Sequence, residues 1–398
     1  MKAMPQIEEE VAEVKSKSFL ASSAPGRADF LNTHQDYKGL PVVPVALNLR
    51  TYMFAVKELD EEFKVVSLNL KREGAAFVDS FKIDRLELKP GKWFGNYFRS
   101  VVLAFKNVTE IKRGLEVFVY SEVPVASGLA SSAALEVSFA KLLDEFYGTN
   151  LKREELAELC YIAENGIMGI PCGRLDQYGS AFGRAILLYP RPPVKVEELS
   201  LEDVMFIVVD SGIRHSVADI HPKRQEDINR GLKILMESPE VPKSLKGKLG
   251  YRYDEPKWEE IALEEIEPYL GLLDEKSAKR IIYTIKANKS TMKAVDLIKR
   301  GEVKENLAIL GGIMNKQHEL MRDLYDLSLP ELERIRNSMI EAGALGVKIS
   351  GAGLGGCLIA LAEAGEDARQ VLEKALVAGA VKGWILKVDK GARIEQLT

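Results

Sequence analysis

The chain has 398 residues, of which 46% are hydrophobic and 29% are charged, a composition typical of a globular protein in water. This length predicts two domains, because one hydrophobic core rarely serves more than about 250–300 residues. The formal net charge of −4 gives no overall attraction to nucleic acid or to an anionic membrane, so neither is expected as a partner. A ligand such as ATP must then be held by local positive groups.

The N-terminal half mixes strand patterns with helix patterns. A charged helix over 1–17 precedes a strand over 18–31, which we expect to break at Ala24-Pro25-Gly26. Further strands are predicted over 40–56, 63–68, 77–83, 115–120 and 185–189, and helices over 93–105, 131–147 and 153–166.

The tripeptide Arg191-Pro192-Pro193 interrupts the pattern and is the expected boundary between domains of 1–190 and 194–398. After it, the continuous apolar run 204–210 predicts a strand buried on both faces. Helical patterns dominate from about 223 to 342, and a glycine-rich pair of strands and a last helix–strand unit follow. The sequence thus predicts an N-terminal α+β domain followed by a second α+β domain.

The three cysteines, Cys160, Cys172 and Cys357, lie in apolar surroundings without CxxC spacing. This usage fits a reducing compartment and argues against a zinc site or a disulfide framework. No apolar run approaches the roughly 20 residues of a membrane span, and the acidic N-terminus is unlike a secretion signal. A cytoplasmic location is therefore expected.

The segment Pro124–Leu135, PVASGLASSAAL, joins a predicted strand to a predicted helix. Unpaired backbone N–H groups and the positive end of the helix dipole favour an anion at such a junction. The small side chains of Gly128, Ala130, Ser131 and Ser132 leave room for a phosphate. Taken alone, however, the segment also fits an ordinary serine-rich helix cap.

The loop Pro25–Gly39 concentrates polar side chains beside a strand, notably Arg27, Asp29, His34 and Asp36. Packing so many hydrogen-bonding groups together is costly unless something pairs with them. A hydroxyl-rich ligand would provide those partners, and an ordinary solvated turn is the alternative.

Two acidic residues flank a Gly-Ile-Pro-Cys-Gly loop in the segment Glu164–Tyr178. Glu164 lies near a predicted helix end and Asp176 follows the loop, so the two can serve as metal ligand and base. Each residue alone is also explained as a helix charge or as an aspartate in a turn.

The segment Lys348–Cys357, KISGAGLGGC, contains the pattern GxGxxG. A dinucleotide-binding site needs a helix directly after these glycines, whereas residues 357–361 predict a strand. We interpret the segment as a glycine turn between strands that passes close to a ligand or another backbone. A Walker-type GxxxxGK[ST] is absent from the sequence, so ordinary P-loop chemistry is not expected.

Together and in this order, the four segments resemble motifs of the GHMP kinase superfamily, most closely those of its galactokinase branch. The sugar motif of that branch corresponds to residues 26–39 and its phosphate loop to 128–134. Its PCG loop corresponds to 171–177 and its C-terminal glycine turn to 350–357. The resemblance covers nearly the whole chain and is far more specific than any single motif.

The resemblance implies an N-terminal α/β domain similar to a ribosomal small-subunit protein, packed against a ferredoxin-like α+β domain. It implies a kinase that transfers the γ-phosphate of ATP to the C1 hydroxyl of galactose or a close analogue. ATP and Mg2+ are the implied cofactors, a small sugar is the implied substrate, and a monomer or homodimer is expected.

By the same resemblance, Asp176 accepts or stabilises the proton of the C1 hydroxyl, while Arg27 steers that hydroxyl and offsets the developing charge. Ser132 and Glu164 are expected to hold Mg2+. These residue types suit phosphoryl transfer, which depends on alignment and charge neutralisation more than on covalent steps.

The remaining residues carried over by the resemblance bind the two substrates. Those expected at the sugar are Thr33, His34, Asp36 and Gly173. Those whose backbone amides are expected to bind the phosphates of ATP are Gly128, Leu129, Ala130, Ser131 and Ser132.

The chain departs from the galactokinase pattern at Asp29, Asn32 and Thr33, where galactokinases have Asn, Gly and a Glu that binds the C6 hydroxyl. Thr33 lacks the negative charge that would repel an acidic C6, and it is also a poorer acceptor for a C6 hydroxyl. A hexuronic acid such as galacturonate, an aminosugar or a pentose therefore stays open. The tyrosine expected after segment 210–216 is missing, and His221–Arg224 stands there without an assigned role.

Two other functions stay open. A catalytically silent, galactokinase-like sensor would bind sugar and nucleotide to control a partner, but such sensors can lose part of the phosphate loop, which is whole here at 131–134. A kinase for mevalonate, homoserine or a related alcohol is disfavoured by the loop with His34, Asp36 and Tyr37, a feature of the sugar branch.

Overall fold

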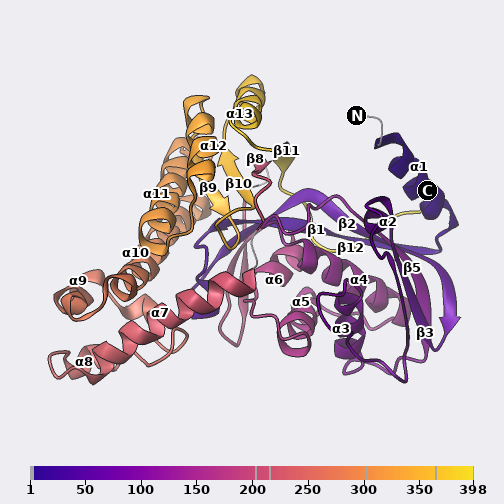
Figure 1. The fold of residues 1–398 in the computed structure, drawn as a ribbon, viewed down its shortest axis with the longest axis horizontal. Helices are drawn as coiled ribbons and strands as arrows, with labels where there is room; N and C mark the ends of the chain where they lie inside the picture. The colour runs from indigo at the N-terminus through magenta and orange to yellow at the C-terminus, as the bar shows by residue number, and fades with distance from the viewer. Residues whose placement is uncertain (1–3, 202–203, 215–216, 302, 364, 398) are drawn as a thin grey trace.

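The computed structural model describes residues 4–201, 204–214, 217–301, 303–363 and 365–397. It has two lobes, a larger one built on a mixed eight-stranded sheet and a smaller sheet of four strands flanked by long helices (Figure 1). The α+β class with two domains that the sequence predicts is confirmed. None of the helices in the described ranges combines the length and the apolar character that a bilayer-spanning segment needs.

The large sheet has the strand order β12-β1-β2-β5-β3-β4, with β6 paired to β2 and β7 paired to β6. All its pairings are antiparallel except that of β3 with β5, which is parallel. Its strands are β1 (Leu20–Leu31), β2 (Val43–Asp60), β3 (Glu62–Ser67), β4 (Val78–Lys82), β5 (Arg113–Ser121), β6 (Ala185–Tyr189), β7 (Lys195–Leu199) and β12 (Arg393–Ile394).

Helices cover both faces of this sheet. Met53 and Ala55 of β2 belong to the core shared with the main helix layer, whereas Phe54 between them packs with Val14 of the N-terminal helix. This alternation follows from the two-residue period of a strand. The helices of this lobe are α1 (Met4–Lys17), α2 (Leu68–Arg72), α3 (Asn96–Phe105), α4 (Ser131–Tyr147), α5 (Arg153–Tyr161) and α6 (Leu175–Phe182).

The smaller sheet is antiparallel throughout, in the order β11-β8-β10-β9, and comprises β8 (Met205–Asp210), β9 (Gly346–Ser350), β10 (Cys357–Leu361) and β11 (Lys382–Lys387). Ile207 and Val209 lie in the core with the helices, while Phe206 and Val208 lie in a second core that includes Phe30 of β1. The strand buried on both faces is therefore confirmed. Its helices are α7 (Val217–Glu237), α8 (Lys243–Lys246), α9 (Leu263–Ile266), α10 (Glu275–Lys299), α11 (Leu307–Tyr325), α12 (Pro330–Glu341) and α13 (Glu366–Val377).

The break expected at Ala24-Pro25-Gly26 is wrong, because β1 runs through it with an irregular register between Pro25 and Arg27. At this irregularity the backbone N–H of Arg27 donates to the carbonyl of Leu129, 3.1 Å away. A partner from another part of the chain thus replaces the missing strand bond and joins β1 to the segment before α4.

Two expected helix ends also differ. The helix predicted from residue 93 begins at Asn96, and the one predicted to end at 166 changes at Ile162–Ile167 into a π-helical turn that carries Glu164. Irregular turns of this kind often occur at functional sites.

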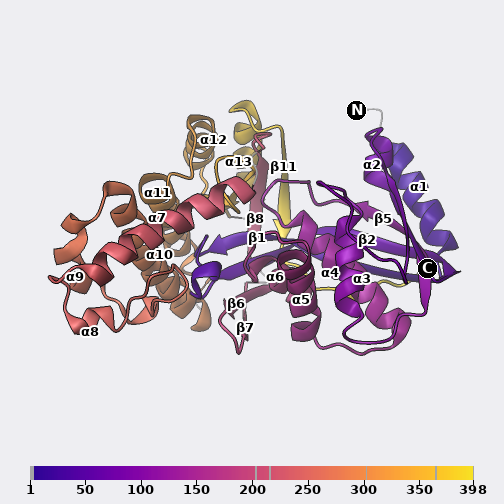
Figure 2. The same cartoon turned by 60° about the horizontal axis from the view of Figure 1, so that its bottom comes forward.

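The proline break at 191–193 lies inside the hairpin formed by β6 and β7, so the large sheet continues beyond the predicted boundary. The chain returns to this sheet once more, when β12 pairs with β1 through Ser22 and Ile394. Arg50 of β2 secures the return with a 2.6 Å ion pair to Asp389. Figure 2 shows β1 and β2 reaching from α4 and α6 toward the smaller lobe.

Candidate active site

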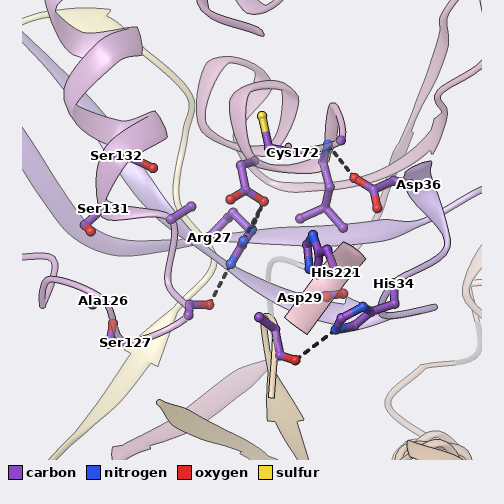
Figure 3. A pocket seen from close by; sticks show the side chains of 17 residues that line it. Arg27, Asp29, His34, Asp36, Ala126, Ser127, Ser131, Ser132, Cys172 and His221 are labelled. Atoms are coloured by element: carbon purple, nitrogen blue, oxygen red, sulfur yellow. Dashed lines mark hydrogen bonds and ion pairs between the residues drawn. The ribbon is translucent and has the colours of Figure 1, made fainter. Parts of the chain in front are cut away.

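The four segments found in the sequence meet around one pocket of about 160 Å³ to which both lobes contribute. In Figure 3, Ser131 and Ser132 lie on one side of it, Asp36 and His221 lie on the other, and Arg27 lies between them. The lining residues are Arg27, Asp29, His34, Asp36, Ala126, Ser127, Gly128, Ala130, Ser131, Ser132, Cys172, Gly173, Leu175, Asp176, His221, Gly351 and Ala352.

The phosphate turn, residues 126–132, leads into α4 without a side-chain cap. Ala130 holds the N-cap position with φ of 56° and makes no capping hydrogen bond, so the serines are not the ordinary cap that was the alternative. The first amides of the helix are left without an intrahelical acceptor, which suits an anion.

Gly128 is required where the phosphate turn meets the glycine turn between β9 and β10. Its φ is 82°, and a Cβ at this position would lie 2.3 Å from the carbonyl oxygen of Ser350. The two turns therefore touch through their backbones. The glycine turn does pass close to another backbone, as its sequence predicts.

Arg27 connects the acid of the site to the phosphate turn. Its Nε and Nη2 donate to Oδ1 of Asp176 at 3.0 and 2.5 Å, and its Nη1 donates to the carbonyl of Gly128 at 2.7 Å. Asp176 lies in the first turn of α6 and keeps 28% of its side chain exposed. Because both bonds from Arg27 end on Oδ1, Oδ2 makes no bond to this arginine.

A second group of carboxylates lies behind Ser132. Gln177 Nε2 donates to Glu164 at 2.5 Å and to Glu136 at 3.5 Å, and Ser132 also bonds Glu164. Burial, with Asp176 nearby, raises the pKa of Glu164 to about 7, and burial beside Glu164 raises that of Glu136 well above its usual range. Oε1 of Glu136 is buried without a hydrogen-bond partner.

Asp36 and Gly173 are in direct contact on the opposite side of the pocket. A Cβ on Gly173 would lie 1.7 Å from Oδ2 of Asp36, so only glycine leaves room for this carboxylate. Burial, with Asp176 and Asp29 nearby, raises the pKa of Asp36 to about 6.

His34 and His221 pack edge to face, with ring centroids 4.6 Å apart. His34 Nε2 bonds the carbonyl of Ala352 at 2.9 Å, so it donates and leaves Nδ1 to accept from the hydroxyl of Tyr37 at 3.1 Å. Burial lowers the pKa of His34 well below its usual range and that of His221 to about 4, so both rings are neutral.

Three predicted site residues do not line the pocket. Thr33 is buried behind Asp29, and its hydroxyl accepts a 2.9 Å hydrogen bond from Lys348 Nζ. Leu129 contributes its carbonyl to Arg27, and Glu164 lies behind Ser132. The other predicted residues all line it, namely Arg27, His34, Asp36, Gly128, Ala130, Ser131, Ser132, Gly173 and Asp176.

Asp29 and His221 also line the pocket. The sequence indicates Asp29 only as one of the polar groups of loop 25–39 and assigns no role to His221. Asp29 could have been found as a departure from the galactokinase pattern inside a motif, whereas His221 lies where the alignment is contracted. His215 and Ser216, which end the motif at 210–216, lie outside the described residues.

Family comparisons agree with this geometry. Residues 96–184 match the family described as GHMP kinases N terminal domain, 293–378 match GHMP kinases C terminal, and 11–57 match the galactokinase galactose-binding signature. The Thermotoga maritima galactokinase is 30% identical over 86% of this chain and 89% of its own length. The chain belongs to the GHMP kinases, enzymes that transfer phosphoryl groups.

Within that family it belongs to the galactokinase branch. Galactokinase from Lactococcus lactis subsp. lactis is 30% identical over 85% of this chain and 82% of its own. The crystal structure of Lactococcus lactis galactokinase complexed with galactose matches with a TM-score of 0.79 and 26% identity, covering 98% of this chain and 100% of that one. A mevalonate kinase structure, with a TM-score of 0.64 and 19% identity, shares the fold.

Proposed function

We propose that the protein transfers the γ-phosphate of ATP to the C1 hydroxyl of galactose or a close analogue. The observation that carries this proposal is the bonding of Arg27, which holds Asp176 and the Gly128 carbonyl together in one pocket. An acid placed beside a phosphate site is the arrangement that aligns a hydroxyl with a phosphoryl group.

The nucleotide end of the pocket would use backbone rather than side chains. The open amides after Ala130 and the N-terminal end of the 17-residue helix α4 would receive the phosphates of ATP. The small residues Ser127, Gly128 and Ser131 leave that approach clear.

Ser132 and Glu164 would hold Mg2+, since a hydroxyl and a carboxylate are the oxygen ligands this ion takes. Mg2+ usually keeps several waters and also binds substrate phosphates, so few protein ligands are needed. Burial raises the pKa of both Glu164 and Glu136, and a bound cation would favour their ionised forms. Bound Mg2+ would neutralise charge on the transferred phosphate.

Asp176 would accept the proton of the C1 hydroxyl as the bond from oxygen to phosphorus forms. Arg27 fixes Oδ1 of this carboxylate, which leaves Oδ2 as the atom that faces the hydroxyl. The guanidinium would also offset negative charge that develops between Asp176 and the phosphate turn.

The three cysteines are unpaired in the structure, which fits the cytoplasmic location expected from the sequence.

A panel of sugars tests the proposal. The protein would be incubated with ATP, Mg2+ and separate hexoses, hexuronates, aminosugars and pentoses, and ADP release and the phosphorylated product would be measured. We expect ADP release with galactose or a close analogue and a product phosphorylated at C1. Sugar binding without ADP release would instead support a sensor.

A further inference from the structure

Asp29 is held in the pocket wall by its own backbone. Its N–H donates to Ser350 Oγ at 2.9 Å, and its carbonyl accepts from Lys348 Nζ at 2.6 Å. The residue is 4% exposed and lines the pocket beside Asp176 and Asp36. The backbone of Asp29 is therefore fixed, and its side chain is buried in the pocket wall.

One oxygen of this carboxylate lacks a partner. The hydroxyl of Thr33 interacts with the Asp29 side chain, whereas Oδ1 of Asp29 is buried with no hydrogen-bond partner. Buried acceptors without donors are rare in folded proteins because they lose water and gain nothing. Since a carboxylate only accepts, the missing partner is a donor.

Thr33 does not line the pocket, and its hydroxyl is engaged inside the protein. Its hydroxyl accepts from Lys348 Nζ at 2.9 Å and interacts with the Asp29 side chain, so it links the buried ammonium to the buried carboxylate. Burial raises the pKa of Asp29, and the positive charges of Lys348 and Arg27 oppose this shift by favouring the ionised form.

The side of the pocket that carries Asp36 and His221 is also rich in hydrogen-bond acceptors. Nδ1 of His221 is buried without a partner, and His221 is already bonded to the backbone of Pro171. Among the described residues lining the pocket, Arg27 is the one cationic side chain, and it is occupied by Asp176 and Gly128. A carboxylate on the substrate would meet negative groups and no free cation.

We propose that Asp29 selects the substrate by accepting a hydrogen bond from a hydroxyl or amino group of the sugar, and that hexuronates are excluded. This inference rests on the proposed function, because it assumes that a sugar occupies the pocket. It narrows the substrate class to neutral sugars and aminosugars and moves recognition from Thr33 to Asp29.

The test measures kcat/KM for galactose, for its derivatives lacking one hydroxyl at a time, for galactosamine and for galacturonate. The wild-type enzyme should prefer galactose to galacturonate by at least about tenfold, and one deoxy derivative should lose a similar factor. In Asp29→Ala, the kcat/KM of that deoxy derivative should lie much closer to the kcat/KM of galactose. The variant lacks the carboxylate that accepts a hydrogen bond from this hydroxyl of galactose, so removing the hydroxyl costs little more. If Asp29→Ala lowers kcat/KM by the same factor for galactose and for every derivative, the proposal is overturned.

Asp29→Asn, which keeps the size of the side chain, decides the question if Asp29→Ala does not fold. Its ratio of galactose to galacturonate should fall at least about tenfold, since one repelling charge is removed; an unchanged ratio would overturn the proposal. Glu58→Gln, at a surface carboxylate paired with Arg113, removes the same charge elsewhere and should keep the wild-type ratio. A wild-type enzyme inert toward every sugar would refute the proposed function as well, whereas activity with unaltered ratios refutes the role of Asp29 alone.

Discussion

The phosphate turn and the sugar wall, defined as Asp29, Asp36 and His221, face the same pocket but are built in opposite ways. The turn offers backbone amides framed by small residues, with no capping side chain at Ala130. The wall offers buried acceptor side chains, of which Asp29 Oδ1 and His221 Nδ1 have no partner.

This contrast suggests a division of roles, in which the phosphate turn serves phosphate binding and the sugar wall serves the choice of substrate. The turn includes Ala126 and Ala130, with φ of 52° and 56°. Backbone donors depend on the shape of the turn more than on which small side chain stands there, so we expect phosphate binding to tolerate small side chains at these positions. A side-chain acceptor is lost or altered when its residue is replaced, so we expect a single change at position 29 to alter the choice of sugar. The comparison yields four predictions.

Asp176→Asn should have the largest effect, because it removes the proton acceptor while keeping the size of the side chain. We expect kcat to fall by about a thousandfold, with the affinity for ATP changed little. Steady-state kinetics and calorimetric titration with a nucleotide measure the two quantities. Turnover near the wild-type level would remove Asp176 from the catalytic role.

Gly128→Ala should be next, because a Cβ there would lie 2.3 Å from the carbonyl oxygen of Ser350 and φ is 82°. The turn must shift, so we expect KM for ATP to rise by at least about tenfold. Ala130→Ser is the matched control, and its KM for ATP should stay within about twofold. Equal effects of the two variants would contradict the idea that backbone shape governs the turn.

Glu164→Gln should change the pH dependence of stability. Burial raises the folded-state pKa of Glu164 from 4.5 to about 7, so between these values the native protein holds a proton that the unfolded chain releases. This group therefore destabilises the fold increasingly as pH rises through that window. Without Mg2+, the variant should be more stable than the wild type at about pH 8, by on the order of 3 kcal/mol, and equal at about pH 4.

Urea unfolding across this pH range measures the difference for Glu164→Gln. Added Mg2+ with nucleotide should narrow the gap, because the wild-type carboxylate then gains a cation. A stability difference that does not vary with pH would show that Glu164 is already ionised or fully neutral throughout.

Thr33→Val should have the smallest effect, because the side chain keeps its shape and does not line the pocket. Loss of the hydroxyl leaves Lys348 and Asp29 without their link, so the carboxylate becomes less well fixed. We expect KM for the sugar to rise a few-fold while KM for ATP stays constant. Parallel changes in both constants would point to a general loss of structure.

Much of the fold could be predicted because its signals are local. The apolar run 204–210 contains β8, and the glycines at 351–356 do separate β9 from β10. The break at Pro25 could not be judged locally, since the bond that replaces the strand pairing at Arg27 comes from Leu129. The proline break at 191–193 likewise resembles a boundary until β7 is seen paired with β6.

The site follows the same division. The acid, the arginine and the phosphate turn were predicted from motifs, and the structure gathers them around the pocket. The position of Thr33 could not be predicted from its motif. Lys348, more than 300 residues later in the chain, bonds its hydroxyl away from the pocket. His221 has a local sequence without a motif, so only the packing of α7 against His34 reveals it.

The pairing of β12 with β1 has a consequence for the order in which the protein folds on the ribosome. The outer edge of β1 is covered at Ser22 and Ser23 by residues 393–394, which are synthesised hundreds of residues later. Until then, the nascent chain carries a strand edge that can pair with other chains. A chaperone that shields this edge during translation would therefore raise the yield of folded enzyme without changing its final stability.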